Sequence, residues 1–249
     1  INKFVDLTGD AYGTVSAAAQ LSKVPAGYYL AKDKDTVTGN DAATLYIVKV
    51  VGNEVVTIAR KADKPTFEKK VQDANDSEGT TTGWQDSADY DIGDTIPYKL
   101  TATLGKLDNY DKYYVKFVDT MDHLTYVADS ASVKLDTTEL TPTQYKLNWD
   151  ETSKTLEIEI TDVKALGAGN GSVITVKYNA TLDDTAVIGS TGNPNEAHLV
   201  FSNNPNGEGY GKTPKDKNIV FTYKVDANKV DPDLNSLPGA AFELFKHVK

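Results

Sequence analysis

Short runs in which apolar and polar residues alternate dominate this sequence, and clusters of Gly, Asn and Asp separate them. Threonine, valine, tyrosine and isoleucine recur in the runs, and these residue types favour strands. Because successive side chains of a strand point to opposite faces, a period of two buries one face and leaves the other in solvent. The pattern therefore predicts an all-β protein built around a β-sandwich.

The clearest strands are expected at residues 98–104, 156–160 and 174–182, and a late apolar run covers residues 219–225. Helix signals are sparse by comparison. They are limited to residues 15–20 and, more weakly, to residues 161–166. The balance of these signals favours strands over helices throughout the chain.

Three polar residues occupy positions where the alternation requires an inward-facing apolar side chain. Lys69 shares its parity with Phe67 and Val71. Asp119 shares its parity with residues 115 and 117, and Asn195 with residues 197, 199 and 201. All three are predicted to enter one core, where an amine, a carboxylate and an amide are costly unless they satisfy one another.

This combination of groups can form a covalent cross-link. A lysine amine is nucleophilic when neutral, and burial lowers its pKa. Burial also favours a protonated carboxylic acid, so Asp119 is expected to polarise the amide of Asn195 and to supply the proton that departing ammonia needs. The product is an isopeptide bond between Lys69 and Asn195, formed by the fold itself.

A second interpretation needs no reaction. Lys69 and Asp119 can form a buried ion pair, and Asn195 can be a turn residue, because Asn193-Pro194-Asn195 is also a loop signal. Strand parity does not decide between the two interpretations. The span would give a cross-link its purpose, since positions 69 and 195 are 126 apart and most of the middle domain lies between them. The loop-entropy treatment of cross-links gives a stabilisation of roughly 5 kcal/mol for such a loop.

The composition narrows the functional class. The 249 residues include no cysteine, which excludes disulfides, cysteine zinc sites and thiol catalysis. The net charge of -10 argues against nucleic acid as a partner. No run approaches the length of about 18 apolar residues typical of a membrane span, so no membrane insertion is expected of this stretch of chain.

Two polar linker segments divide the chain into three parts. One lies before Pro65 and the other spans residues 224–238, which contain several Pro and Gly breakers. We expect the C-terminal part of an N-terminal domain at residues 1–63, a β-sandwich at 64–223 and the opening strands of a further domain at 224–249. The abrupt start and end suggest an internal fragment, with targeting and anchoring signals expected outside it.

Several segments of the middle domain resemble a known family. They are KPTFEK at residues 64–69, GWQDSADYDIGD at 83–94, NPNEA at 193–197 and SNNP at 202–205. Together they resemble the isopeptide-forming middle domain of sortase-assembled backbone pilins of Gram-positive bacteria, over roughly residues 64 to 223. The resemblance implies a collagen-adhesin A-type, immunoglobulin-like β-sandwich, with Lys69 as the linking lysine, Asp119 as the acid and Asn195 as the amide.

The flanks carry two further lysines that the resemblance marks. Lys229 matches the usual cross-linking lysine of a second adhesin-type, B-type domain, with partners expected beyond Lys249. Lys61 lies where a sortase joins backbone pilins, but the Tyr-Pro pair of that motif is absent and Lys64 is close by. A solvated linker lysine is the alternative for Lys61.

Other candidate sites are weaker. Asp73, Asn75, Asp76 and Glu78 resemble the start of a calcium loop, but the glycine and distal glutamate of an EF-hand are missing, and a solvated acidic loop fits better. The three histidines form no pair with metal-ligand spacing and no triad with a serine. No metal and no other cofactor is therefore expected.

These observations predict a structural protein and not an enzyme, apart from its own cross-linking reaction. The resemblance implies the shaft subunit of a covalently polymerised pilus, which is extracellular and anchored to the cell wall, with other pilin subunits and a pilus-specific sortase as partners. The alternative is a cell-wall-anchored adhesin that uses the same sandwich to hold a host or matrix ligand.

Overall fold

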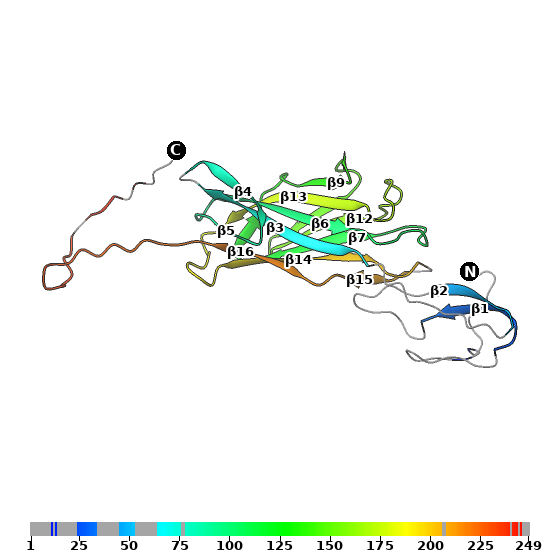
Figure 1. Cartoon of the computed structure of the whole chain (residues 1–249). Coiled ribbons are helices and arrows are strands. Elements are labelled where there is room, and N and C mark those ends of the chain that lie inside the picture. The colour runs from blue at the N-terminus through cyan, green and yellow to red at the C-terminus, as the bar shows by residue number, and fades with distance from the viewer. Residues whose placement is uncertain are drawn as a thin grey trace.

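The computed structural model describes residues 11, 13, 24–33, 45–52, 64–75, 78–205, 208–239, 241–243 and 245. Every regular element in these residues is a β-strand, which confirms the predicted all-β class. The described part of the chain contains no helix that is long and apolar enough to cross a membrane. Figure 1 shows the strands from Thr66 onwards gathered in one body, with the two earlier strands apart from it.

The first layer is a sheet of seven strands in the order β10-β9-β13-β6-β3-β4, with β8 paired to β13. All of its pairs are antiparallel. Its strands are β3 (Thr66–Asn75), β4 (Thr80–Gln85), β6 (Thr95–Thr103), β8 (Leu124–Tyr126), β9 (Ser132–Leu135), β10 (Thr138–Glu139) and β13 (Val173–Leu182).

The second layer is also a sheet of seven strands, in the order β11-β12-β7-β14-β16-β5, with β15 paired to β14. The pair β16–β5 is parallel, and the others are antiparallel. Its strands are β5 (Ser87–Asp89), β7 (Val115–Met121), β11 (Lys146–Asp150), β12 (Thr155–Ile160), β14 (Asn193–Ser202), β15 (Tyr210–Lys212) and β16 (Asp216–Phe221).

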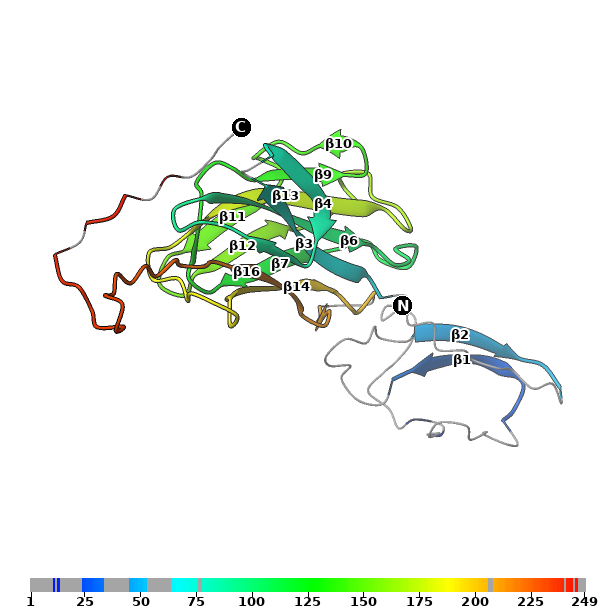
Figure 2. The ribbon, with the colours of Figure 1, turned by 60° about the vertical axis from the view of Figure 1, so that its left-hand side comes forward.

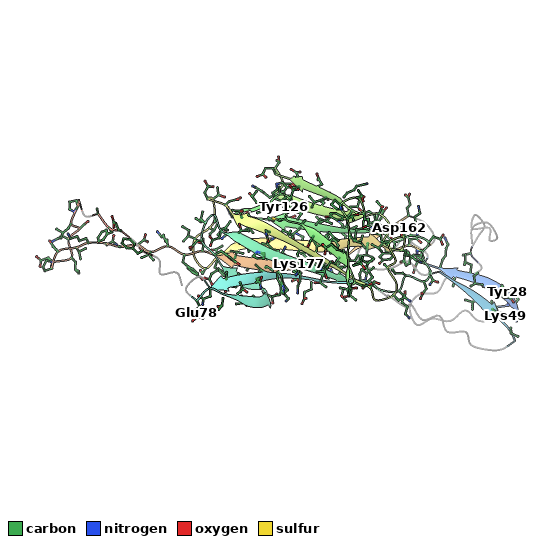
Figure 3. The ribbon with its side chains drawn as sticks, turned by 90° about the horizontal axis from the view of Figure 1, so that it is seen from above. Tyr28, Lys49, Glu78, Tyr126, Asp162 and Lys177 are labelled. Carbon is green, nitrogen blue, oxygen red and sulfur yellow. The ribbon has the colours of Figure 1, made fainter. Side chains whose placement is uncertain are left out.

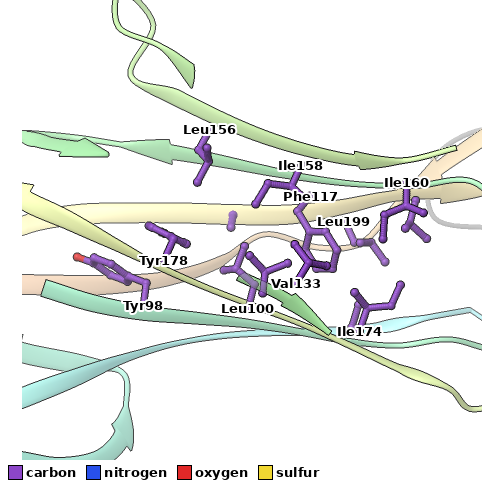
Figure 4. Packing of buried hydrophobic residues seen from close by; sticks show 14 of the residues in the cluster. Tyr98, Leu100, Phe117, Val133, Leu156, Ile158, Ile160, Ile174, Tyr178 and Leu199 are labelled. Atoms are coloured by element: carbon purple, nitrogen blue, oxygen red, sulfur yellow. The ribbon is translucent and has the colours of Figure 1, made fainter. Parts of the chain in front are cut away.

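The core lies between the two sheets, as the alternating pattern predicts. Along β6, β12 and β13 every second side chain is buried. Figure 4 shows aliphatic side chains from the two sheets meeting over the aromatic ring of Phe117. Sheets packed in this way hold inward-facing positions about 10 Å from the opposite layer, so a long inward side chain of one sheet reaches the other.

A separate antiparallel pair, β1 (Gly27–Lys32) and β2 (Leu45–Val50), precedes the sandwich in the sequence. Figure 2 shows these two strands side by side. C-terminal to the sandwich, residues 223–230 are exposed and carry no strand, and an isolated bridge joins Val230 to Ser236. The domain boundaries at 63/64 and 223/224, and the second domain from residue 224 onwards, stay predictions.

Three of the four expected strands are confirmed, as β6, β12 and β13. The bounds of β12 and β13 agree within one residue, whereas β6 begins three residues earlier than expected, at Thr95. The expected strand at 219–225 is too long, because β16 ends at Phe221 and Tyr223 and Val225 are exposed. The weak helix expected at 161–166 is wrong, and the segment forms a single turn. The Asp162 carboxylate accepts the backbone N–H groups of residues 164 and 165, and Gly167, with φ of 98°, ends the turn.

Figure 3 shows the sandwich from above, with Asp162 and Glu78 toward opposite ends of it. The helix expected at residues 15–20 lies outside the described residues.

Candidate functional site

The three inward polar residues meet between the sheets. Lys69 comes from β3 of the first sheet, whereas Asp119 comes from β7 and Asn195 from β14 of the second. Each of the three residues has a relative exposure of 0%. In the second sheet, Asp119 lies opposite Ala197, two residues along β14 from Asn195 on the same face. The predicted burial is confirmed, and Asn195 lies within a strand and not in a turn.

Lys69 and Asp119 are in direct contact. The Nζ atom of Lys69 lies 2.5 Å from Oδ2 of Asp119. Two aromatic rings cover the amine, because Nζ lies 4.8 Å from the ring centre of Tyr98 and 5.5 Å from that of Tyr178. The amine therefore sits in a water-excluded space with one carboxylate and two ring faces as its surroundings.

Tyr178 connects all three groups, and the sequence analysis missed it. Its hydroxyl donates to Oδ2 of Asp119 at 2.6 Å, accepts from Nζ of Lys69 at 2.9 Å and accepts from Nδ2 of Asn195 at 3.0 Å. A hydroxyl has one donor and two acceptor positions, so all of them are used. The available signal was the inward parity of Tyr178 in β13, because a buried phenol normally finds a polar partner.

The backbone of Lys69 is fixed by side chains of β16. The Lys69 N–H donates to Oδ2 of Asp216 at 2.7 Å, and the Lys69 carbonyl accepts from Nδ2 of Asn218 at 3.2 Å. These bonds link β3 of the first sheet to β16 of the second at the residue whose side chain crosses the core. They hold the amine at a defined depth between the sheets.

Burial makes deprotonation of the Lys69 amine easier than in water. Burial lowers the pKa of Lys69, and the charge and hydrogen bond of Asp119 oppose this effect without cancelling it. Burial, reinforced by the charge of Asp119, raises the pKa of Tyr178 well above its ordinary value. Tyr178 therefore stays a neutral phenol at physiological pH and keeps its proton available for donation.

Three atoms of the site have no well-formed hydrogen bond among the described residues. They are Oδ1 of Asp119, Oδ1 of Asn195 and the hydroxyl oxygen of Tyr98, and all three are buried. Leaving such groups unsatisfied is costly, and in native proteins it often marks a reactive site. The Asn195 amide, whose carbon a lysine nucleophile would attack, is buried in the same cluster as the Lys69 amine.

The other predicted residues lie apart from this site. Lys61 and Asp76 lie outside the described residues. Lys229 is exposed, and its carbonyl accepts the N–H of Leu237.

Asp73 and Asn75 take part in local structure. Oδ1 of Asp73 accepts the backbone N–H of Asp89, and Oδ1 of Asn75 accepts that of Glu78. Within the described residues, no group of three or more His, Asp or Glu side chains is arranged to hold a metal ion.

Comparisons with known proteins place this geometry in context. No protein-family model matches the chain. A curated relative, the trypsin-resistant surface T6 protein of Streptococcus pyogenes, is 34% identical over 84 residues, which cover 28% of this chain and 16% of that protein. The match is therefore confined to a small part of the relative.

Solved structures extend the similarity to most of the chain. The T6 backbone pilin of Streptococcus pyogenes has a TM-score of 0.55 at 20% identity, covering 78% of this chain and 46% of its own. A C-terminal fragment of the major pilin GBS80 of Streptococcus agalactiae has a TM-score of 0.53 at 20% identity, covering 70% and 61%. The full-length major pilin SpaD of Corynebacterium diphtheriae has a TM-score of 0.51 at 20% identity, covering 76% and 46%.

This chain therefore spans about half to three fifths of the length of these pilin structures. The chain has the all-β sandwich fold of the major, or backbone, pilins of Gram-positive bacteria.

Proposed function

We propose that this chain is part of a shaft subunit of a covalently polymerised cell-surface pilus. Its sandwich forms an intramolecular isopeptide bond between Lys69 and Asn195, with Asp119 as the catalytic acid and base. The observation that carries the proposal is the fully buried cluster of amine, carboxylate and amide between the two sheets. The shared fold with backbone pilins supports the shaft role.

The chemistry begins with the Lys69–Asp119 contact. Moving one proton from Nζ to Oδ2 converts the ion pair into a neutral amine and a carboxylic acid, which a dry site favours. The amine then attacks Cγ of Asn195, the new Nζ–Cγ bond forms, and the Cγ–Nδ2 bond breaks. Ammonia leaves, and no external enzyme or cofactor takes part.

The bond would join the two layers of the sandwich. Lys69 lies in the first sheet and Asn195 in the second, so the cross-link bridges sheets that are otherwise held by side-chain packing and by hydrogen bonds such as those of Asp216 and Asn218. Force applied to a shaft subunit would then meet a covalent bond between β3 and β14. This arrangement suits a protein whose task is to carry load.

Mass spectrometry of the purified protein tests the bond. The wild type is expected to weigh one ammonia less than its sequence, and Asp119→Ala is expected to restore the full mass. Asp122→Ala is the matched control, because Asp122 lies three residues away with its side chain 65% exposed, and this variant should keep the deficit. A wild-type protein of full mass would exclude the cross-link.

Polymerisation is tested separately, in a bacterium that produces the full-length protein. If Lys61 is the lysine that sortase joins to the next subunit, Lys61→Ala abolishes the high-mass ladder in cell-wall extracts, and the control Lys64→Ala retains it. A ladder that persists in both variants, together with lost adhesion to a host or matrix ligand, would favour the cell-wall-anchored adhesin instead.

A further inference from the structure

Tyr178 occupies a position that the cross-linking reaction does not yet explain. No direct hydrogen bond joins Asp119 to Asn195 among the described residues, although the leaving nitrogen of Asn195 needs a proton. The Tyr178 hydroxyl lies between them, 2.6 Å from Oδ2 of Asp119 and 3.0 Å from Nδ2 of Asn195. We propose that Tyr178 is a catalytic residue that relays the proton from Asp119 to the departing nitrogen, an inference that rests on the proposed isopeptide bond.

The distances permit the relay in both directions. In the resting site the chain of donors runs from Nδ2 of Asn195 to the Tyr178 oxygen, and from the Tyr178 hydroxyl to Oδ2 of Asp119. Once Lys69 has given a proton to Oδ2, that oxygen becomes a donor and the chain can reverse. The Asp119 carboxyl then donates to the Tyr178 oxygen while Tyr178 donates its own proton to Nδ2.

The protons balance across the full reaction. Lys69 starts as an ammonium with three protons, and Asp119 starts as a carboxylate. The first proton of Nζ passes through Oδ2 and the Tyr178 hydroxyl to the Asn195 nitrogen, which leaves as ammonia. The second proton of Nζ passes to Oδ2 after the attack, and the third remains on the new amide. Tyr178 ends as a neutral phenol and Asp119 as a carboxylic acid.

The surroundings of Tyr178 suit a fixed relay. Its ring stacks on Tyr98 at a centroid distance of 5.3 Å and an interplanar angle of 13°, and the two residues are register partners in β13 and β6. Figure 4 labels Tyr98 and Tyr178 next to each other toward one end of the core. Because burial also raises the pKa of Tyr178, the hydroxyl is protonated and held in place when the reaction needs it.

A merely structural role is the competing explanation, since the hydroxyl also satisfies three buried polar groups. Tyr98 separates the two possibilities. Its ring stacks on that of Tyr178, is equally buried and lies over the same amine. Its hydroxyl interacts with the Asn195 amide without a well-formed hydrogen bond and, among the described residues, makes no hydrogen bond to Asp119, so it does not connect the acid to the leaving nitrogen. Tyr178→Phe and Tyr98→Phe therefore remove the same volume from the core. Only Tyr178→Phe removes the hydroxyl that joins Asp119 to Asn195.

The experiment follows bond formation in time. Wild type, Tyr178→Phe and Tyr98→Phe are made by cell-free synthesis and quenched with acid at intervals, and the loss of ammonia is read by mass spectrometry, with circular dichroism reporting folding. Tyr178→Phe is expected to fold but to form the bond at least about 100-fold more slowly, within the range of general acid–base catalysis. Tyr98→Phe is expected to stay within a few-fold of wild type.

A second measurement needs no variant. Two protons move together along the Asp119–Tyr178–Asn195 chain. The rate of bond formation in the wild type, plotted against the fraction of heavy water in the solvent, should therefore be curved and not linear. A linear dependence of the rate on the heavy-water fraction would overturn the relay and leave the cross-link in place. Equal rates of bond formation in Tyr178→Phe and Tyr98→Phe, in proteins that carry the bond, would do the same. A wild-type protein without the mass deficit would overturn the relay and the cross-link together.

Discussion

Replacing Asn195 with alanine removes the acyl donor but leaves the Lys69–Asp119 contact in place. The lost cross-link closes a loop of 126 positions, for which the loop-entropy treatment gives about 5 kcal/mol of stabilisation. The lost hydrogen bond from Nδ2 to Tyr178 adds about 1 kcal/mol. We therefore expect Asn195→Ala to lower the free energy of unfolding by about 6 kcal/mol, or to lower Tm by roughly 12–24 °C for a domain of this size.

Guanidinium unfolding, followed by circular dichroism, measures this difference, and mass spectrometry of the same samples reports the bond. Asn193→Ala is the matched control, because Asn193 lies two residues before Asn195 in β14 and is equally buried. Its amide donates to the backbone carbonyls of Val187 and Val220 and, among the described residues, makes no hydrogen bond to Lys69, so the variant is expected to lose about 1–3 kcal/mol while keeping the mass deficit. Equal destabilisation by the two variants would refute a cross-link of this span.

Two further predictions concern charge and backbone. In Asp119→Ala the unlinked Lys69 has a pKa lowered by burial, so the folded state binds fewer protons than the unfolded chain between that lowered pKa and about pH 10.4. The free energy of unfolding of Asp119→Ala therefore rises with pH in that window, by at most about 1.4 kcal/mol per pH unit relative to wild type. The wild type lacks this rise because its linked Lys69 does not titrate. Parallel pH profiles of the two proteins in denaturant unfolding would contradict this prediction. Gly192→Ala places a Cβ 2.4 Å from Cγ2 of Ile219 at a φ of 66°, whereas Gly93→Ala at a φ of 91° meets no atom within 4 Å. Gly192→Ala should cost about 1–3 kcal/mol more than Gly93→Ala in the same assay, and equal costs would contradict the clash.

Local pattern determined the fold class and the orientation of the reactive residues. The period of two holds along β6, β7, β12 and β13, and along β14 as far as Leu199, because one face of each strand is buried and a shift of one residue would invert it. That constraint identified Lys69, Asp119 and Asn195 as inward-facing without knowledge of their neighbours. The same reasoning failed at residues 161–166, where a single turn capped by Asp162 reads like the start of a helix.

The sequence by itself therefore determined an all-β chain with three polar side chains directed into its core. Only the tertiary structure decided which atoms meet. It placed Tyr178 between the carboxylate and the amide, and it fixed the Lys69 backbone through Asp216 and Asn218. The physical reason is that strand parity is a local property of the chain, whereas the packing of one sheet on another depends on the register and twist of strands far apart in sequence.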